Sequence, residues 1–412
     1  MDSITLTKKE FKYLFLIIVV FIAACIETDI YLPAFPDMML YFGISETQIQ
    51  HLLTYNFVGI CLAGPLYGPI SDALGRKKPI LTALGLFLIG SIMTLYAQNF
   101  ETMLWGRILQ GIGSGGCFTL GTAIIFDAFS EKKAVAALNQ INAIVPFIMA
   151  AAPMLGGYLN HTYGFRSNFL AIAVCVFISF IISLGVLEET LPKNKRTYFQ
   201  IKKIGGEFKL VLTSFPFWVV TIVVSLIFAS YLAFLSNTAL LFVLEFGIDK
   251  HWLPFFQAAL LGSWLMANLI FSFLIKYCEV KKIKQMGLVL MIASCFILLC
   301  ATWLTPHNPY SFTSGMMLYA FGANWINGFY FPEGMELFPD SKGVTASILT
   351  SIRLLVTAAI VALTAKLYNG TIYPIAGVVL GTMFIAIPLI MLYERKYAKQ
   401  PLIVESKRYL EI

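Results

Sequence analysis

The stretch GPLYGPISDALGRKKP, residues 64–79, inserts one acid and three consecutive basic residues between two long apolar segments. Gly75 stands directly before the basic residues and permits a tight turn with positive φ. Gly68 would let a neighbouring helix approach closely, and Asp72 at the membrane edge can face the partially positive N-terminus of another helix. The stretch therefore predicts a short charged loop between two membrane-spanning helices.

The composition extends this prediction to the whole chain. Of the 412 residues, 58% are hydrophobic and only 12% are charged, which is about half the charged share of typical soluble domains. Apolar segments of about 20 residues recur from end to end, each long enough to cross a hydrocarbon core of roughly 30 Å. We therefore expect an all-α polytopic membrane protein. Its twelve predicted spans are residues 11–33, 47–70, 79–98, 101–127, 133–159, 167–187, 214–244, 252–277, 283–304, 310–336, 343–367 and 372–393.

The basic residues indicate how the chain crosses the membrane. With the amino terminus in the cytoplasm, nearly all lysines and arginines outside the spans fall on one side, and the opposite loops hold little beyond Arg166 and Lys250. This asymmetry predicts two cytoplasmic termini and an even number of spans. The formal net charge of +7 is thus an orientation signal. The longest stretch between spans, residues 188–213, is a predicted cytoplasmic linker between two six-helix bundles, residues 1–187 and 214–412.

The charged loop also carries a family resemblance. Gly68, Asp72, Gly75 and the basic residues from Arg76 to Lys78 fit the pattern G-x-x-x-D-x-x-G-R-[KR]-[KR] at every defining position. In this the chain resembles the major facilitator superfamily. The resemblance implies twelve transmembrane helices in two six-helix bundles, each built from inverted three-helix repeats, and transport by alternating access.

Further stretches resemble one group within that superfamily. Residues 189–192 read E-T-L-P, and residues 29–36 fit the pattern D-x-Y-L-P-A-x-P; both are similar to the Bcr/CflA drug-resistance transporters. Residues 143–159, AIVPFIMAAAPMLGGYL, resemble the antiporter-associated motif, although Ala152 stands where its most typical form has glycine. The residues that carry this motif are Pro153, Gly156 and Gly157. The resemblance implies exchange of drugs for protons.

The resemblance also assigns roles to the charges of the loop. In the family the arginine of the motif pairs with an acid at the cytoplasmic end of span four, a place that Asp127 occupies here. Asp72 would face the start of span eleven, near residues 341–343. Asp72, Arg76 and Asp127 would then hold the two halves together on the cytoplasmic side while the cavity faces outward. The two lysines after Arg76 serve either this gate or only the orientation in the membrane.

Three charges of the first half lie inside the predicted bilayer. Glu27 and Asp29 fall in span one and Arg107 in span four, within LWGRILQGIGSGG, residues 104–116. Each buried charge costs about 2.5–3.5 kcal/mol on insertion scales, so such residues are functional candidates that are expected to have partners. Helical rise from a span centre near Phe21 puts Glu27 about 9 Å and Asp29 about 12 Å toward the outer face, with Arg107 at matching depth.

Only one of the two acids is expected to face the central cavity, because residues two apart on a helix point in nearly opposite directions. The family pattern contains Asp29 and not Glu27, so the resemblance favours Asp29 as the cavity acid. Asp29, with Glu27 and Arg107, would couple transport to protons. The alternative is a fixed ion pair between Asp29 and Arg107 that holds the helices and never titrates.

The second half contains one isolated intramembrane charge, Arg353, near the middle of span eleven and without an acid at the same depth. It would contact either an anionic group of the substrate or backbone carbonyls. Uncharged polar side chains could add hydrogen bonds to a substrate, although each alone is more often a helix-packing residue. These candidates are Asn56, Asn237, Asn324 and Asn327.

These features together favour proton-coupled efflux of small, mostly hydrophobic compounds, as in a multidrug antiporter. An alternative with the same fold is a dedicated exporter of a self-made metabolite such as a siderophore or peptide. An uptake symporter or uniporter is disfavoured by the antiporter motif. The sequence contains no catalytic constellation, phosphate-binding loop or metal-ligand spacing, so we do not expect an enzyme.

The expected partners are the lipid bilayer, protons and a small-molecule substrate, without nucleic acid, cofactor or metal. We expect a monomer that spans the inner (cytoplasmic) membrane of the cell many times.

Overall fold

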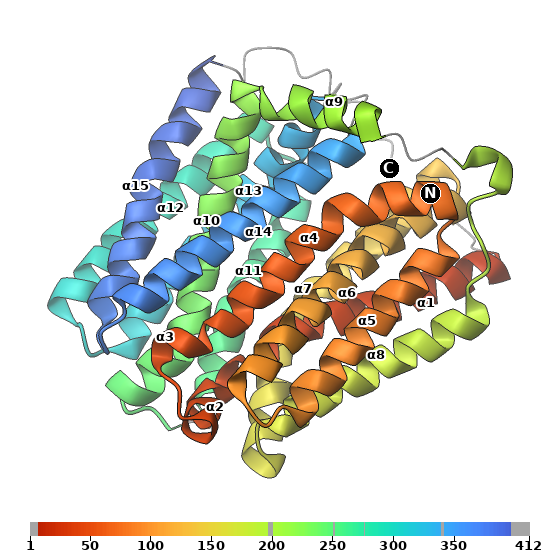
Figure 1. Ribbon diagram of the computed structural model, residues 1–412. Helices are drawn as coiled ribbons and strands as arrows, with labels where there is room; N and C mark the ends of the chain where they lie inside the picture. The colour runs from red at the N-terminus through yellow and green to blue at the C-terminus, as the bar shows by residue number, and fades with distance from the viewer. Residues whose placement is uncertain (1–6, 197–200, 250–251, 276, 339–341, 397–412) are drawn as a thin grey trace. The chain divides into compact units, whose positions relative to one another are not determined.

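In the computed structural model the chain folds into helices joined by short turns, with no strand in the residues described, which are 7–196, 201–249, 252–275, 277–338 and 342–396 (Figure 1). The long helices are α1 (Lys8–Asp29), α4 (His51–Leu74), α5 (Lys77–Tyr96), α6 (Phe100–Ala128), α7 (Glu131–Tyr163), α8 (Arg166–Val186), α10 (Phe215–Leu240), α11 (Leu253–Leu274), α12 (Val280–Leu304), α13 (Pro309–Glu336), α14 (Lys342–Leu367) and α15 (Ile372–Lys396). The shorter ones are α2 (Phe35–Phe42), α3 (Glu46–Ile49) and α9 (Ile201–Leu212).

Each of the twelve predicted spans coincides with one of the long helices. Within the described part of the chain, ten helical segments are long and apolar enough to cross a membrane. The other two predicted spans, 133–159 and 310–336, correspond to α7 with 33 residues and α13 with 28 residues. At 1.5 Å per residue both are longer than a hydrocarbon core of roughly 30 Å. The predicted fold class, an all-α polytopic membrane protein, is confirmed.

The helix α1 ends at Asp29, before the predicted span end near residue 33, although the apolar helical segment that could cross a membrane continues to Phe42. Pro33 has no backbone N–H, so it cannot donate the helical hydrogen bond to the carbonyl of Asp29. A single 3₁₀ turn, η1 (Leu32–Ala34), follows, and α2 then continues the chain. Asp29 therefore lies at the last position of a helix, next to a break in the regular hydrogen-bond pattern.

Contacts divide the chain into two compact units. The first comprises Met1–Lys203 with Asp249–Phe255, and the second comprises Ile204–Ile248 with Phe256–Ile412. In the first unit α6 packs most extensively on α4 and α5, and α8 packs on α5 and α1. In the second unit α12 packs on α13, and α10 packs on α14 and α15. The predicted linker contains the helix α9, which the sequence analysis did not anticipate.

Glycines on α6 explain how closely its neighbours approach. A Cβ added at Gly111 would lie 2.1 Å from the carbonyl oxygen of Asn56 on α4. A Cβ added at Gly113 would lie 2.4 Å from the Cβ of Phe87 on α5. Any side chain at these positions would push the helices apart. This close approach brings polar groups of α4, α5 and α6 within hydrogen-bond distance of one another inside the unit.

Candidate functional site

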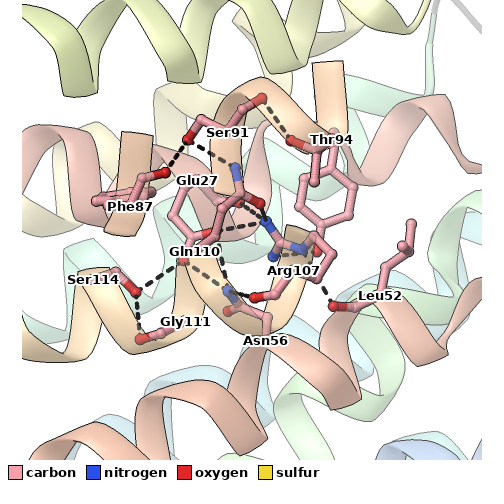
Figure 2. Close-up of polar contacts among 11 residues, drawn as sticks. Glu27, Leu52, Asn56, Phe87, Ser91, Thr94, Arg107, Gln110, Gly111 and Ser114 are labelled. Carbon is pink, nitrogen blue, oxygen red and sulfur yellow. Dashed lines mark hydrogen bonds and ion pairs between the residues drawn. The ribbon is translucent and has the colours of Figure 1, made fainter. Parts of the chain in front are cut away.

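A buried ion pair joins the first and fourth spans of the amino-terminal unit (Figure 2). The Nη1 atom of Arg107 on α6 lies 2.7 Å from the Oε2 atom of Glu27 on α1, and both side chains are 0% exposed. The same Nη1 donates to the carbonyl oxygen of Glu27 at 3.4 Å. The attraction between two opposite charges at this separation offsets part of the free-energy cost of removing each charge from water, whereas a single buried charge would have no such compensation.

The carboxylate of Glu27 also accepts hydrogen bonds from neutral donors. The amide Nδ2 of Asn56 on α4 donates to Oε1 at 3.1 Å and to Oε2 at 3.3 Å. The hydroxyl of Ser114 on α6 donates to Oε1 at 3.2 Å. Both carboxylate oxygens are therefore satisfied. The structure thus brings Asn56, a predicted substrate-binding residue, into the same cluster as Glu27 and Arg107.

The guanidinium of Arg107 has further partners, one on its own helix and two outside it (Figure 2). Its Nη1 donates to Gln110 Oε1 at 2.7 Å, its Nη2 donates to the hydroxyl of Tyr31 at 3.0 Å, and its Nε donates to the carbonyl of Leu52 at 3.3 Å. Gln110 in turn donates to Ser91 on α5 at 3.1 Å. The network thereby ties together α1, α4, α5 and α6. The sequence analysis missed Gln110, although its spacing of three residues from Arg107 puts both on one face of the helix.

Asp29 is placed differently from Glu27. Its side chain is 0% exposed, and within the described part of the chain neither carboxylate oxygen has a hydrogen-bond partner. The sequence analysis favoured Asp29 as the cavity acid and offered an ion pair between Asp29 and Arg107 as the alternative, but the structure pairs Glu27 with Arg107. Residues two apart on a helix point nearly opposite ways, so only one acid can reach the arginine. The role of Asp29 as the proton carrier stays a prediction.

The predicted antiporter motif contacts the segment that follows Asp29. Gly156 of α7 lies so close to it that an added Cβ would stand 1.6 Å from the carbonyl oxygen of Ile30. Pro153 is buried. Pro153 and Gly157 both lie within α7, which continues to Tyr163. The glycine therefore lets α7 pack directly on the backbone where α1 ends.

Replacing Gly156 by alanine is expected to lower the unfolding temperature of the purified protein, because the new methyl group would overlap the carbonyl of Ile30. Overpacking of this kind costs typically about 1–3 kcal/mol. The matched control is Gly185→Ala on α8, where an added Cβ meets no atom within 4 Å. Thermal unfolding in detergent measures both. Equal unfolding temperatures for the two variants would contradict the predicted overlap.

Arg76, in the turn between α4 and α5, forms the predicted ion pairs with Asp72 near the end of α4 and with Asp127 on α6. Arg76 donates from Nε to Asp127 Oδ2 at 2.7 Å and from Nη1 to Asp72 Oδ1 at 2.6 Å. Burial disfavours the charged form of Arg76, but the hydrogen bonds and negative charges of Asp127 and Asp72 together outweigh it, so the pKa of the guanidinium lies above its ordinary value. The gating role of this cluster stays a prediction. The expected contact of Asp72 involves residues 341–343, whose side chains lie outside the described part of the chain.

Glu189, in the E-T-L-P stretch, belongs to the same loop structure. Its Oε1 accepts hydrogen bonds from the backbone N–H of Arg76 at 2.7 Å and of Leu191 at 3.0 Å. Gly75 has a φ of +94°, as predicted, and an added Cβ there would lie 2.2 Å from Glu189 Oε2. Gly68 differs from expectation, because an added Cβ meets nothing within 4 Å among the described residues. Sequence reasoning treated Glu189 only as part of a family pattern and missed its contact with the loop.

In the second unit Arg353 lies between two aromatic rings. Its Cζ is 4.8 Å from the ring centroid of Phe228 and 5.1 Å from that of Phe331. Both contacts are within the range of cation–π attraction. Its Nε atom is buried without a hydrogen-bond partner among the described residues. The structure therefore gives Arg353 aromatic neighbours that sequence reasoning did not foresee.

The three asparagines predicted in the second half lie on two helices. Asn237 is buried on α10, where its Nδ2 donates to the carbonyl of Ala233 at 2.7 Å. Asn324 and Asn327 lie on α13, buried and half-buried respectively. The bond from Asn237 is made within its own helix, as for a packing residue. The role of all three in substrate binding stays a prediction.

A second charge cluster, which the sequence analysis missed, connects α12, α13 and α15. The Nζ of Lys284 lies 2.6 Å from Glu333 Oε1 and 2.9 Å from Glu394 Oε1. The hydroxyl of Tyr330 also donates to Glu394 at 2.9 Å. The three charged residues are up to 110 positions apart in the chain, so no local spacing could have signalled their contact.

The long apolar helices and the buried ion pair between spans define a polytopic membrane protein of the transporter type. The chain belongs to the Major Facilitator Superfamily, because the model of that family matches residues 17–362. It is therefore a membrane transporter and not an enzyme.

Curated relatives match the chain over most of their length. The uncharacterized MFS-type transporter YdgK of Bacillus subtilis (strain 168) is 25% identical over 389 residues, covering 92% of this chain and 94% of that protein. The multidrug transporter MdfA of Edwardsiella piscicida is 23% identical over 381 residues, covering 91% and 92%. The multidrug resistance protein MdtM of Escherichia coli O157:H7 is 24% identical over 368 residues, covering 87% and 88%.

Two solved structures share the fold. A bacterial homolog to the human lysosomal transporter Spinster, in an inward-facing and unoccupied conformation, has a TM-score of 0.70 at 16% identity and covers 93% of this chain and 94% of that one. The human organic anion transporter MFSD10 (TETRAN) has a TM-score of 0.66 at 16% identity and covers 92% and 99%. At such identities the likeness speaks for the fold alone.

Proposed function

We propose that this transporter exports small, mostly hydrophobic compounds in exchange for protons, by alternating access. Multidrug transporters among its relatives support the substrate class, and the stretches that resemble the Bcr/CflA group favour the same direction of transport. The excess of basic residues in one set of loops supports an orientation in which both termini lie on the cytoplasmic side of a bacterial inner membrane.

The observation that carries the proposal is the burial of Asp29 without a hydrogen-bond partner among the described residues, two positions from Glu27, which is paired with Arg107. An ionised carboxylate buried without a cation or a donor is costly, whereas a neutral carboxyl is tolerated more readily. Asp29 is therefore the acid suited to hold a proton in one state and to release it when water or a cation reaches it in another. It is the last residue of α1, directly before the chain leaves the regular α-helix.

Glu27 and Arg107 have a different task in this proposal. Both carboxylate oxygens of Glu27 are hydrogen-bonded. The guanidinium of Arg107 donates to groups on α1, α4 and α6 and to Tyr31. A pair with so many partners favours a fixed, charged state. It would hold spans one, two and four in place around the end of α1, so that Asp29 can change its protonation without loss of the local structure.

The proposal is tested by adding candidate substrates to the purified protein in weakly buffered detergent solution and measuring proton release. A panel of hydrophobic drugs and metabolites identifies the substrate. A drug:proton antiporter is expected to release protons when a substrate binds, because substrate and proton exclude each other. Substrate binding without any proton release across the pH range 6 to 8, roughly the range in which a perturbed carboxyl could titrate, would contradict proton exchange.

One observation favours the second candidate, a dedicated exporter of an anionic metabolite. Arg353 lies between Phe228 and Phe331, with a buried Nε that has no hydrogen-bond partner among the described residues. A guanidinium placed in this way suits a substrate with an anionic or aromatic group. Transport of one anionic compound and none of the hydrophobic drugs in the same panel would favour this candidate.

A further inference from the structure

We propose that the groove between α4 and α5 binds one acyl chain of an anionic phospholipid, with the lipid phosphate at Lys78. The two helices both pack on α6 and much less on each other, which leaves a hollow of about 360 Å³ between them. Ile112 of α6 is among the residues that line it. This groove lies apart from the Glu27–Arg107 cluster and the charged loop's ion pairs.

The groove has the chemistry of a hydrocarbon site. Its lining from α4 includes Leu62, Leu66 and Leu74, which are 56%, 54% and 55% exposed. A row of half-exposed leucines along a membrane-spanning helix is an apolar surface, and contact with hydrocarbon keeps that surface away from water. An acyl chain supplies such a cover.

The length of the groove matches one leaflet of a bilayer. Leu62 and Leu74 lie twelve residues apart on α4, which corresponds to about 18 Å of helix. Half of a hydrocarbon core is about 15 Å thick. A lipid chain lying along α4 would therefore extend from the membrane surface to near the midplane, with its headgroup at the end where Leu74 and Lys78 stand.

Charge at that end specifies the headgroup. Lys78 lines the groove, its side chain is exposed, and no ion pair of it with an acid is present among the described residues. Arg76, two positions earlier, is by contrast taken up by Asp72 and Asp127. A free ammonium beside a hydrocarbon groove favours a lipid with net negative charge, because a zwitterionic headgroup carries its own cation.

The test is native mass spectrometry of the full-length protein in detergent, with phosphatidylglycerol or phosphatidylcholine of identical acyl chains. The unmodified protein is expected to retain one phosphatidylglycerol about fivefold more strongly than phosphatidylcholine, which corresponds to about 1 kcal/mol for one basic residue. Equal retention of the two lipids by the unmodified protein would overturn the proposal, and this comparison needs no variant.

Variants then locate the site. Lys78→Gln is expected to abolish the preference, whereas Lys77→Gln, which removes the same charge one position away, should keep it. Ile70→Trp, which fills the groove, is expected to reduce retention of both lipids, whereas Leu170→Trp on the exposed face of α8 should not. An equal effect of the two lysine variants, or full retention by Ile70→Trp, would refute binding in this groove.

Discussion

Replacing Arg107 by methionine is expected to destabilise the protein more than any exposed substitution. The change leaves the carboxylate of Glu27 buried without its cation, and breaking a buried pair in this way costs about 3–5 kcal/mol. The unfolding temperature in detergent should fall on the order of 10 °C. Glu27→Gln should act in the same direction, because it leaves the guanidinium of Arg107 buried without a compensating charge.

The double variant Glu27→Gln/Arg107→Met measures how far the effects of the two single substitutions depend on each other. It removes both charges, so it is expected to be more stable than Arg107→Met alone, with a favourable coupling energy in the double-mutant cycle. Lys9→Met is the matched control, since it breaks a pair with Glu188 whose side chains are 65% and 70% exposed. Exposed pairs contribute about 0–1 kcal/mol. Additive effects of the two buried changes would contradict the interdependence of Glu27 and Arg107.

Replacing Asp29 by asparagine is expected to remove proton coupling while the protein stays folded. Asparagine has nearly the same shape but cannot take up or release a proton, and the carboxyl it replaces has no cation partner within the described residues. Substrate-induced proton release and transport driven by a pH gradient should fall by roughly tenfold or more, as for an essential intramembrane acid. Exchange of labelled for unlabelled substrate across proteoliposomes should persist, because it needs no net proton movement.

The control is Glu101→Gln, which removes an exposed acid from the first turn of α6. This variant should retain proton release. Undiminished proton-driven transport in Asp29→Asn would end the proposal that Asp29 carries the proton. If Glu27→Gln remained folded and alone lost proton release, Glu27 would be the carrier and the roles of the two acids would be exchanged.

The sequence predicted the number and position of the spans because hydrocarbon imposes one simple requirement. A segment that crosses it must be apolar over about 20 residues and must satisfy its backbone within a helix. In the charged stretch of residues 64–79, the positive φ at Gly75 and the pairing of Arg76 with Asp127 both appeared as predicted. The turn itself is only Gly75 and Arg76, because α4 runs to Leu74 and α5 begins at Lys77. The break in the helix at Asp29, four residues before the predicted end of the first span, was not predicted, although Pro33 carried the signal for it.

The side-chain clusters of the second half, around Lys284 and Arg353, could not be predicted from the sequence. Lys284 meets Glu333 and Glu394 from helices that are distant in the chain, and no local period records such contacts. The aromatic rings on either side of Arg353 likewise come from α10 and α13. Each of these contacts depends on how helices pack within the unit, which composition and spacing leave open.

Composition and spacing were enough to predict a membrane protein with charged residues inside the bilayer, among them Glu27, Asp29 and Arg107 in the first half. Which of the two acids pairs with the arginine depends on how the helices pack. The packing of α1 against α6, and the donors that α4 brings to Glu27, select that residue. Asp29, two positions further on the same helix, points another way and is left buried without a hydrogen-bond partner among the described residues.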